Sequence, residues 1–203
     1  MKILSSDFLY LLRAPKAVTL PTLTEPEIRQ RIWMELQRAT QDQHHEWRTP
    51  VLATVDANGT PQARTVVLRQ ALDKPAQLQV YTDSRSPKVA ELAAHSRTAL
   101  VFWSTRLSWQ LRVQADITVQ TAGPEVDAAW ARVSQSAAAG DYLSVTAPGA
   151  ALVHAHTAPD EARHPHHLTV LTAQVLEIDW LELARSGHRR ATISADTWVW
   201  RVP

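Results

Sequence analysis

The chain has 203 residues, of which 45% are hydrophobic and 20% are charged, so it suits one domain with a sizeable core. Its formal net charge of +1 gives no argument for a nucleic-acid partner or a membrane surface. The absence of cysteine excludes disulfides, thiol catalysis and cysteine-ligated metal centres, and it fits a reducing compartment.

The N-terminal segment does not have the pattern of a secretion signal. Asp7 interrupts its apolar stretch, and Arg13 closes that stretch after five apolar residues, whereas a secretory segment has a longer uncharged core. Nothing in the sequence approaches the roughly 18 consecutive apolar residues of a membrane span. We therefore expect a cytoplasmic protein in which residues 1–21 form an irregular arm.

Residues 22–43 are predicted to form the first helix. Thr24 and Glu27 have the spacing of a capping box, and Pro26 is tolerated in a first helical turn. Apolar residues then recur at helical spacing from Ile28 onward, which indicates one buried face.

After residue 48 the pattern changes to strands. The segment 50–70 carries two apolar runs around Asn58 and Gly59, a strong hairpin signal. Further strands are predicted at 76–83, 98–105, 108–120, 170–183 and 197–203. Strands at this spacing predict a mainly β fold with helices (α+β), an antiparallel small barrel.

Two shorter helices are predicted between the strands, at 86–95 and 123–140. Ser86 and Pro87 give the first of them a clear N-cap and first helical position. The segment 147–167 contains three prolines and five histidines, and we expect it to be the least structured stretch. Since the sequence shows no repeat and no linker, residues 1–203 are predicted to be a single domain.

Basic residues gather at the start of the 86–95 helix. Arg85 and Lys88 flank a helix N-terminus, where unpaired N–H groups and the helix dipole favour an anion. The stretch "RTVVLR", residues 64–69, adds a guanidinium at each of its ends. The alternative is a solvated loop with exposed cations, but three arginines and one lysine together favour a phosphate-sized site.

Several stretches resemble pyridoxamine 5'-phosphate oxidase and its relatives. They are "PVLATVDANGTPQARTVVLR", "VYTDSRSPKVAEL", "WQLRV" and the C-terminal "EIDWLELARSGHRRATISADTWVWRVP". This resemblance implies a dimeric FMN-binding split β-barrel, with the cofactor at the subunit interface. The chain is most similar to the oxidase-related branch, and a flavin-dependent oxidoreductase role is the implied function.

The resemblance also implies a set of cofactor contacts. These are Arg64, Thr65, Val66, Val67, Leu68, Arg69, Tyr81, Thr82, Arg85, Ser86, Lys88, Gln110, Trp180 and Arg190. By analogy with the family, the FMN phosphate is held by Arg64, Lys88 and Arg85. The segment 66–69 flanks the flavin ring, Gln110 hydrogen-bonds the cofactor, and Trp180 and Arg190 come from the partner subunit.

The sequence departs from the family pattern at four places, one of them the replacement of a tryptophan-glycine-glycine segment before the late strand by "HPHH", residues 164–167. Pro87 stands where the oxidase has a second phosphate-binding arginine, and we hypothesise that Arg85 compensates. Ser186 replaces the substrate-binding arginine of the C-terminal motif, leaving His188 as a candidate substrate contact. The tyrosine and arginine of the oxidase's substrate helix are not recognisable in residues 127–140. We therefore expect weak or absent oxidation of pyridoxine phosphate.

Three alternatives remain open from the sequence. The first is a metal site, because five histidines lie at 154–167. No carboxylate pattern completes a ligand set, so no metal site is predicted. A haem-binding split barrel is a second class, and a non-enzymatic flavin carrier or sensor is a third.

Overall fold

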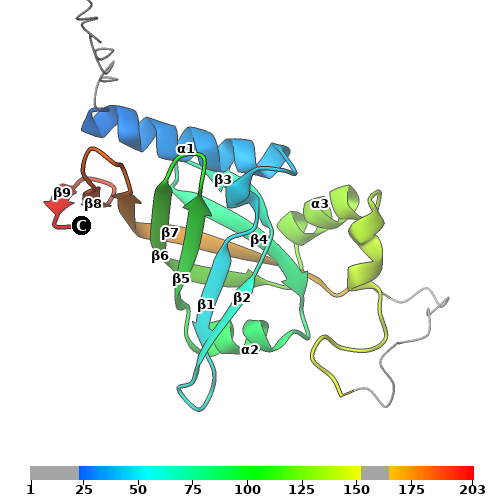
Figure 1. Ribbon diagram of the computed structural model, residues 1–203. Helices are drawn as coiled ribbons and strands as arrows, with labels where there is room; N and C mark the ends of the chain where they lie inside the picture. The colour runs from blue at the N-terminus through cyan, green and yellow to red at the C-terminus, as the bar shows by residue number, and fades with distance from the viewer. Residues whose placement is uncertain (1–22, 152–164) are drawn as a thin grey trace, which may run out of the picture.

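A computed structural model describes residues 23–151 and 165–203 (Figure 1). The helices are α1 (Glu25–Gln41), α2 (Pro87–Ala94) and α3 (Pro124–Val133), with 3-10 turns η1 (Glu46–Arg48) and η2 (Ala137–Tyr142). The strands are β1 (Val51–Val55), β2 (Pro61–Thr65), β3 (Leu68–Leu72), β4 (Gln77–Asp83), β5 (Arg97–Ser104), β6 (Trp109–Gln120), β7 (Leu168–Glu182), β8 (Arg189–Ile193) and β9 (Trp198–Arg201).

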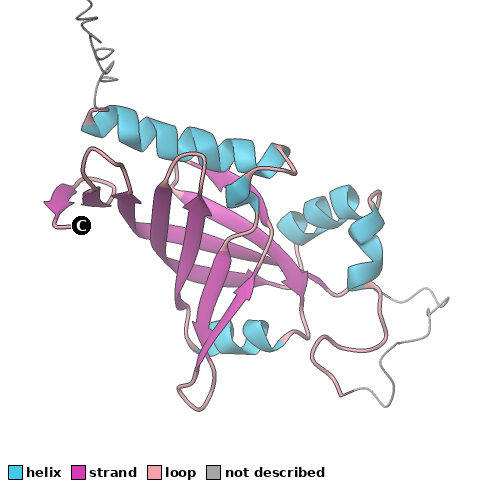
Figure 2. Cartoon of the chain, viewed as in Figure 1, coloured by secondary structure: helices cyan, strands magenta, loops and turns pink. Residues whose placement is uncertain are grey.

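All nine strands belong to one antiparallel sheet, in the order β2-β1-β5-β6-β7-β4-β3, with β8 added to β7 and β9 to β8. Strand β7 links the two parts of the sheet. Its residues 168–174 pair with β4, and its residues 178–182 pair with β8. The predicted mainly β, antiparallel fold with peripheral helices is confirmed (Figure 2).

The three helices lie at different places around the sheet (Figure 1). Helix α1 crosses one end, α2 covers the opposite end, and α3 packs beside β4 and β7. The predicted capping box of α1 is present, because the Thr24 backbone N–H donates to Glu27 Oε2 at 2.8 Å. The helix begins at Glu25 rather than residue 22 and buries Ile28 and Leu36.

Two apolar clusters hold these elements together. The larger one lies between the strands and α1, and it contains Leu52, Leu78 and Phe102. The smaller one joins α3 to the first part of β7 through Val126 and Val170. Leu78 and Val80 of β4 and Leu92 of α2 belong to the larger cluster, so both elements pack against it.

The segment 64–69 is not one strand, contrary to the sequence prediction. Strand β2 ends at Thr65, and β3 begins at Leu68 and pairs with β4 instead of β1. The Val66 N–H still donates to the Pro50 carbonyl at 2.9 Å, after which the chain crosses to the other part of the sheet. The strand break therefore places the two arginines of "RTVVLR" on different strands.

Two other boundaries differ from the prediction. Helix α3 ends at Val133, because the serine-rich segment 134–136 forms a turn in which Ser136 Oγ bonds the Val133 carbonyl at 2.7 Å. Strand β8 was not predicted from the sequence, since its two arginines hide the alternation of Ala191 and Ile193.

Some predictions fall outside the described part of the chain. The expected arm at 1–21 and the histidines at 154, 156 and 164 belong to the segments that the structure does not describe. Among the described residues, no helix is both long and apolar enough to cross a membrane, and no group of three metal-ligating side chains occurs.

Candidate functional site

The first group of predicted residues meets at the start of α2. We call Thr54, Arg64, Thr82, Ser86, Lys88 and Glu91 the α2 cluster. Lys88 Nζ donates to Thr82 Oγ1 at 3.0 Å and also contacts Ser86 Oγ. Arg64 Nη2 donates to Glu91 Oε2 at 2.9 Å, and Arg64 Nη1 contacts Thr54 Oγ1.

Strand alternation and a helix start assemble this cluster. Thr82 lies on the inward face of β4 with Leu78, and Arg64 lies opposite inward-facing Leu52. Pro87 starts the helix directly after Ser86, which brings Lys88 back over the end of β4. Burial and the nearby charge of Arg64 lower the pKa of Lys88, against the opposing effect of Glu91.

Arg85 has a different set of contacts. Its guanidinium donates to both oxygens of Asp83, at 3.0 and 2.7 Å, and to the carbonyls of Ser144 and Val145. Burial alone would raise the pKa of the Asp83 carboxyl, but hydrogen bonds from Arg85 outweigh this and lower it. Arg85 therefore fixes the 144–145 loop beside α2, and most of its donors are engaged.

A second group lies on the α3 side of β4. Arg69 lies over the Tyr81 ring at 5.8 Å, and Arg132 Nη2 donates to Tyr81 Oη at 2.8 Å. These three residues line a cavity of about 830 Å³ between α1, β3 and α3. Arg132 was not predicted, because it lies in the last turn of α3, where the helix dipole alone accounts for a cation. The contact of Arg132 with Tyr81 arises only from the packing of α3 beside β4, which local sequence does not reveal.

A third group occupies the outer face of the sheet. We call Gln110, Arg112, Asp179 and Arg190 the outer-face cluster. Arg190 donates to both Asp179 oxygens, at 2.9 and 2.7 Å, and Arg112 contacts the same carboxylate. Burial alone would raise the Asp179 pKa, but these guanidinium contacts lower it. Gln110 lies on the same strand face as Arg112, two residues away.

The remaining predicted residues are dispersed. The Trp180 side chain has 0% exposure, with its ring 5.2 Å from that of Trp109. Val66 and Leu68 are also buried, whereas Thr65 is exposed at the end of β2. Ser186 and His188 lie in the exposed turn before β8. Trp180 Nε1 has no hydrogen-bond partner among the described residues, and its contact with the cofactor stays a prediction.

Two buried polar atoms test whether these residues suit a phosphorylated ligand. Arg69 Nε and Thr169 Oγ1 have no hydrogen-bond partner among the described residues. Thr169 lies directly opposite Thr82 in the β4–β7 register, beside the hydroxyl that Lys88 contacts. Unpaired donors of this kind are costly unless a ligand or water satisfies them. The unpaired Thr169 hydroxyl beside the cations and hydroxyls of the α2 cluster therefore fits an FMN phosphate, whereas Arg69 Nε is an unpaired donor in the second group.

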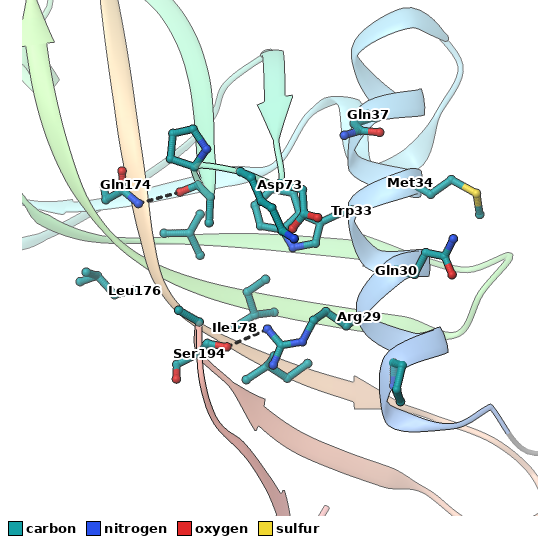
Figure 3. Close-up of a pocket in the computed structure, with 17 residues that line it drawn as sticks. Arg29, Gln30, Trp33, Met34, Gln37, Asp73, Gln174, Leu176, Ile178 and Ser194 are labelled. Carbon is teal, nitrogen blue, oxygen red and sulfur yellow. Dashed lines mark hydrogen bonds between the residues drawn. The ribbon is translucent and has the colours of Figure 1, made fainter.

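A second, larger cavity of about 900 Å³ lies under α1 and contains none of the predicted residues (Figure 3). Trp33, Leu176 and Ile178 contribute apolar surface to it. Its Arg29 side chain is held by the Ser194 carbonyl at 2.7 Å. The volume of a cavity alone therefore does not identify the functional site.

Comparison of the sequence with known proteins identifies one family. Residues 30–121 match the family model for the pyridoxamine 5'-phosphate oxidase FMN-binding domain. The pyridoxine/pyridoxamine 5'-phosphate oxidase of Thermosynechococcus vestitus is 34% identical over 148 residues, which cover 67% of each chain. The corresponding enzyme of Chromohalobacter salexigens is 39% identical over 94 residues, or 46% of this chain and 42% of that protein.

Solved structures share the fold. A pyridoxamine 5'-phosphate oxidase-related, FMN-binding protein from Nostoc punctiforme superposes with a TM-score of 0.68 at 23% identity, covering 90% of this chain and 99% of that one. PhzG from Burkholderia lata, solved with tetrahydrophenazine-1-carboxylic acid, gives a TM-score of 0.63 at 15% identity, covering 88% and 92%. These structures show the shared fold, and the sequence matches place this chain in the pyridoxamine 5'-phosphate oxidase FMN-binding family.

Proposed function

We propose that the protein binds FMN and acts as a flavin-dependent oxidoreductase of the pyridoxamine 5'-phosphate oxidase-like type. The α2 cluster is the observation that carries this proposal. It joins Arg64, Lys88 and two hydroxyls at a helix start, the donor set that a phosphate monoester requires. Family membership supports the same cofactor.

In this proposal the groups of residues have separate tasks. Arg64, Ser86 and Lys88 hold the phosphate, while Arg69 lies where the chain crosses from β2 to β3 and faces the ring. Gln110 and Arg190 donate hydrogen bonds to the cofactor. The flavin, once bound, supplies the redox chemistry, so the protein contributes binding, orientation and exclusion of water.

A homodimer would bring these groups together. Val51, Val55 and Trp103 form an exposed apolar surface on β1 and β5, and the Trp103 side chain is 44% exposed. Trp103 pairs directly with Gln110 in the β5–β6 register, so this surface is continuous with the outer-face cluster. We propose that a second copy covers the apolar surface and that its outer-face cluster completes the cofactor site.

The cavity beside α3 suggests the substrate class. Arg69 and Arg132 line it on either side of Tyr81, and two guanidinium groups favour an anionic substrate. Ser186 replaces a substrate-binding arginine of the family motif, and each lost charge-assisted contact is worth about 1.5–3 kcal/mol. We therefore propose an anionic substrate other than pyridoxine phosphate, with His188 as a further candidate contact.

The proposed cofactor site is tested by titrating the protein with FMN and with riboflavin, followed by flavin fluorescence. Wild-type protein should bind FMN more tightly than riboflavin, because only FMN carries the phosphate. Lys88→Met should remove most of this difference, since it deletes the central ammonium of the α2 cluster without burying a new charge.

Lys74→Met provides the matched control. Lys74 is exposed in the β3–β4 turn, so this substitution removes the same charge at a site away from the α2 cluster. It should leave both affinities unchanged. Equal FMN affinity in wild-type and Lys88→Met protein would contradict the assignment of the phosphate to this cluster.

A further inference from the structure

Two carboxylates, Glu91 within the α2 cluster and Asp83 next to it, limit the positive charge that is available to bind a phosphate. Arg85 is paired with Asp83, and Arg64 is paired with Glu91 at 2.9 Å. Lys88 is therefore the one basic side chain of this region without a carboxylate partner among the described residues. Pro87 contributes no charge where the family pattern has an arginine.

Glu91 is built into the cluster rather than lying at its edge. Its side chain is 10% exposed, and Oε2 accepts from both Arg64 Nη2 and Thr54 Oγ1, the latter at 2.5 Å. Thr54 in turn contacts Arg64 Nη1, so the three side chains form a closed network. The same Glu91 charge acts on Lys88, whose pKa it raises against the effects of burial and Arg64.

A phosphate that binds Arg64 must share one guanidinium with this carboxylate. Two effects of opposite sign follow. Glu91 orients Arg64, which favours binding, and its negative charge repels a phosphate dianion, which opposes binding. At partly buried sites the repulsion between charges a few ångströms apart exceeds the benefit of fixing one side chain.

We propose that Glu91 is a specificity-determining residue that weakens the phosphate receptor, so that FMN is held as an exchangeable ligand rather than permanently. This inference rests on the proposed FMN site. Glu91 acts against the phosphate alone, so it narrows the difference in affinity between FMN and unphosphorylated flavin. A protein with these properties takes up and releases FMN as the free flavin concentration changes.

The test compares wild-type protein with Glu91→Gln, titrated with FMN and with riboflavin and followed by flavin fluorescence and by the FMN dissociation rate. Glutamine keeps an oxygen for Arg64 and Thr54 but removes the charge. FMN affinity should rise by about tenfold or more, mostly through slower dissociation, and riboflavin affinity should not change.

Asp196→Asn is the matched control, because Asp196 is exposed in the turn before β9 and its loss changes the net charge equally. It should alter neither affinity. Glu91→Ala removes the same charge by a different side chain and should also tighten FMN binding, which guards against a folding defect in one variant.

The outcomes separate this inference from the proposed function. Wild-type binding of FMN with equal or weaker binding by both Glu91 variants overturns the inference and leaves the FMN site standing. Tighter FMN binding by both Glu91 variants than by wild type, with riboflavin affinity unchanged, supports the inference. Failure of every form to bind FMN overturns both.

Discussion

Asp83 and Glu91 each pair with an arginine that the sequence pattern assigns to an anion. The sequence predicts that Arg64, Arg85 and Lys88 lie near one helix start, and in the structure Arg64 and Lys88 belong to the same cluster. Their carboxylate partners depend on side-chain orientation and on contacts between strand and helix, which no spacing reveals. The residue types of the site are therefore predictable, whereas its charge balance is not.

The ion pair between Arg85 and Asp83 predicts what the loss of Arg85 does to stability. Removal of Arg85 leaves the Asp83 carboxylate, which is 5% exposed, without its guanidinium partner. Arg85→Ala should lower the free energy of unfolding by about 2 kcal/mol, measured by denaturant titration. FMN affinity should change by less than about threefold, because most Arg85 donors already bond Asp83 and the 144–145 loop.

The earlier hypothesis that Arg85 replaces a phosphate-binding arginine makes the opposite prediction for FMN. A large loss of FMN affinity in Arg85→Ala, with stability unchanged, would support that hypothesis and contradict the structural role. Arg201→Ala, an exposed arginine of β9, serves as the control for loss of one guanidinium.

At the scale of elements, the strands and helices with a clear period were predictable, and the breaks between them were not. The Asn58-Gly59 hairpin and the inward alternation of β4 follow from local sequence, and both are present. The interruption at residues 66–67 is set by β3 pairing with β4 rather than β1, which is a long-range choice. The apolar run continues through the break, so the sequence carries no local signal for it.

Helix α1 has a buried ionic anchor that makes its attachment sensitive to acid. Glu35 is 2% exposed and accepts from His45 Nε2 at 2.9 Å and from Arg106 Nη2 at 2.6 Å. The Trp47 N–H donates to His45 Nδ1, which leaves Nε2 as the proton-bearing atom toward Glu35. This anchor ties the helix to η1 and to the β5–β6 turn.

The pH dependence of this anchor has a defined sign. Burial alone would raise the Glu35 pKa, but the bonds from His45 and Arg106 outweigh it, and the pKa lies below its ordinary value of 4.5. A lowered pKa gives stability that is complete above 4.5 and is lost as the pH falls through the lower folded-state value.

Glu35→Gln should therefore reduce the part of the unfolding free energy that wild-type protein loses between neutral and acidic pH, measured by denaturant titration. Glu177→Gln is the control, because Glu177 has no ion pair with any residue that the structure describes. An identical acid response in wild-type and Glu35→Gln protein would show that this carboxylate does not couple folding to pH.

At the scale of the whole molecule, the candidate cofactor residues lie in three groups that a single chain does not gather. The α2 cluster lies at one end of the sheet, the Arg69–Tyr81–Arg132 group lies beside α3, and the outer-face cluster lies next to exposed Trp103. We propose that a second copy of the chain brings these groups together in one site. The proposed cofactor and the proposed dimer are therefore one claim.

Sedimentation velocity of the FMN-saturated protein, followed at the visible flavin band, tests that claim directly. The flavin absorbance should sediment with a species of twice the 22.7 kDa chain mass. Flavin absorbance that remains unbound at saturating FMN, or that sediments with a single chain, would contradict it.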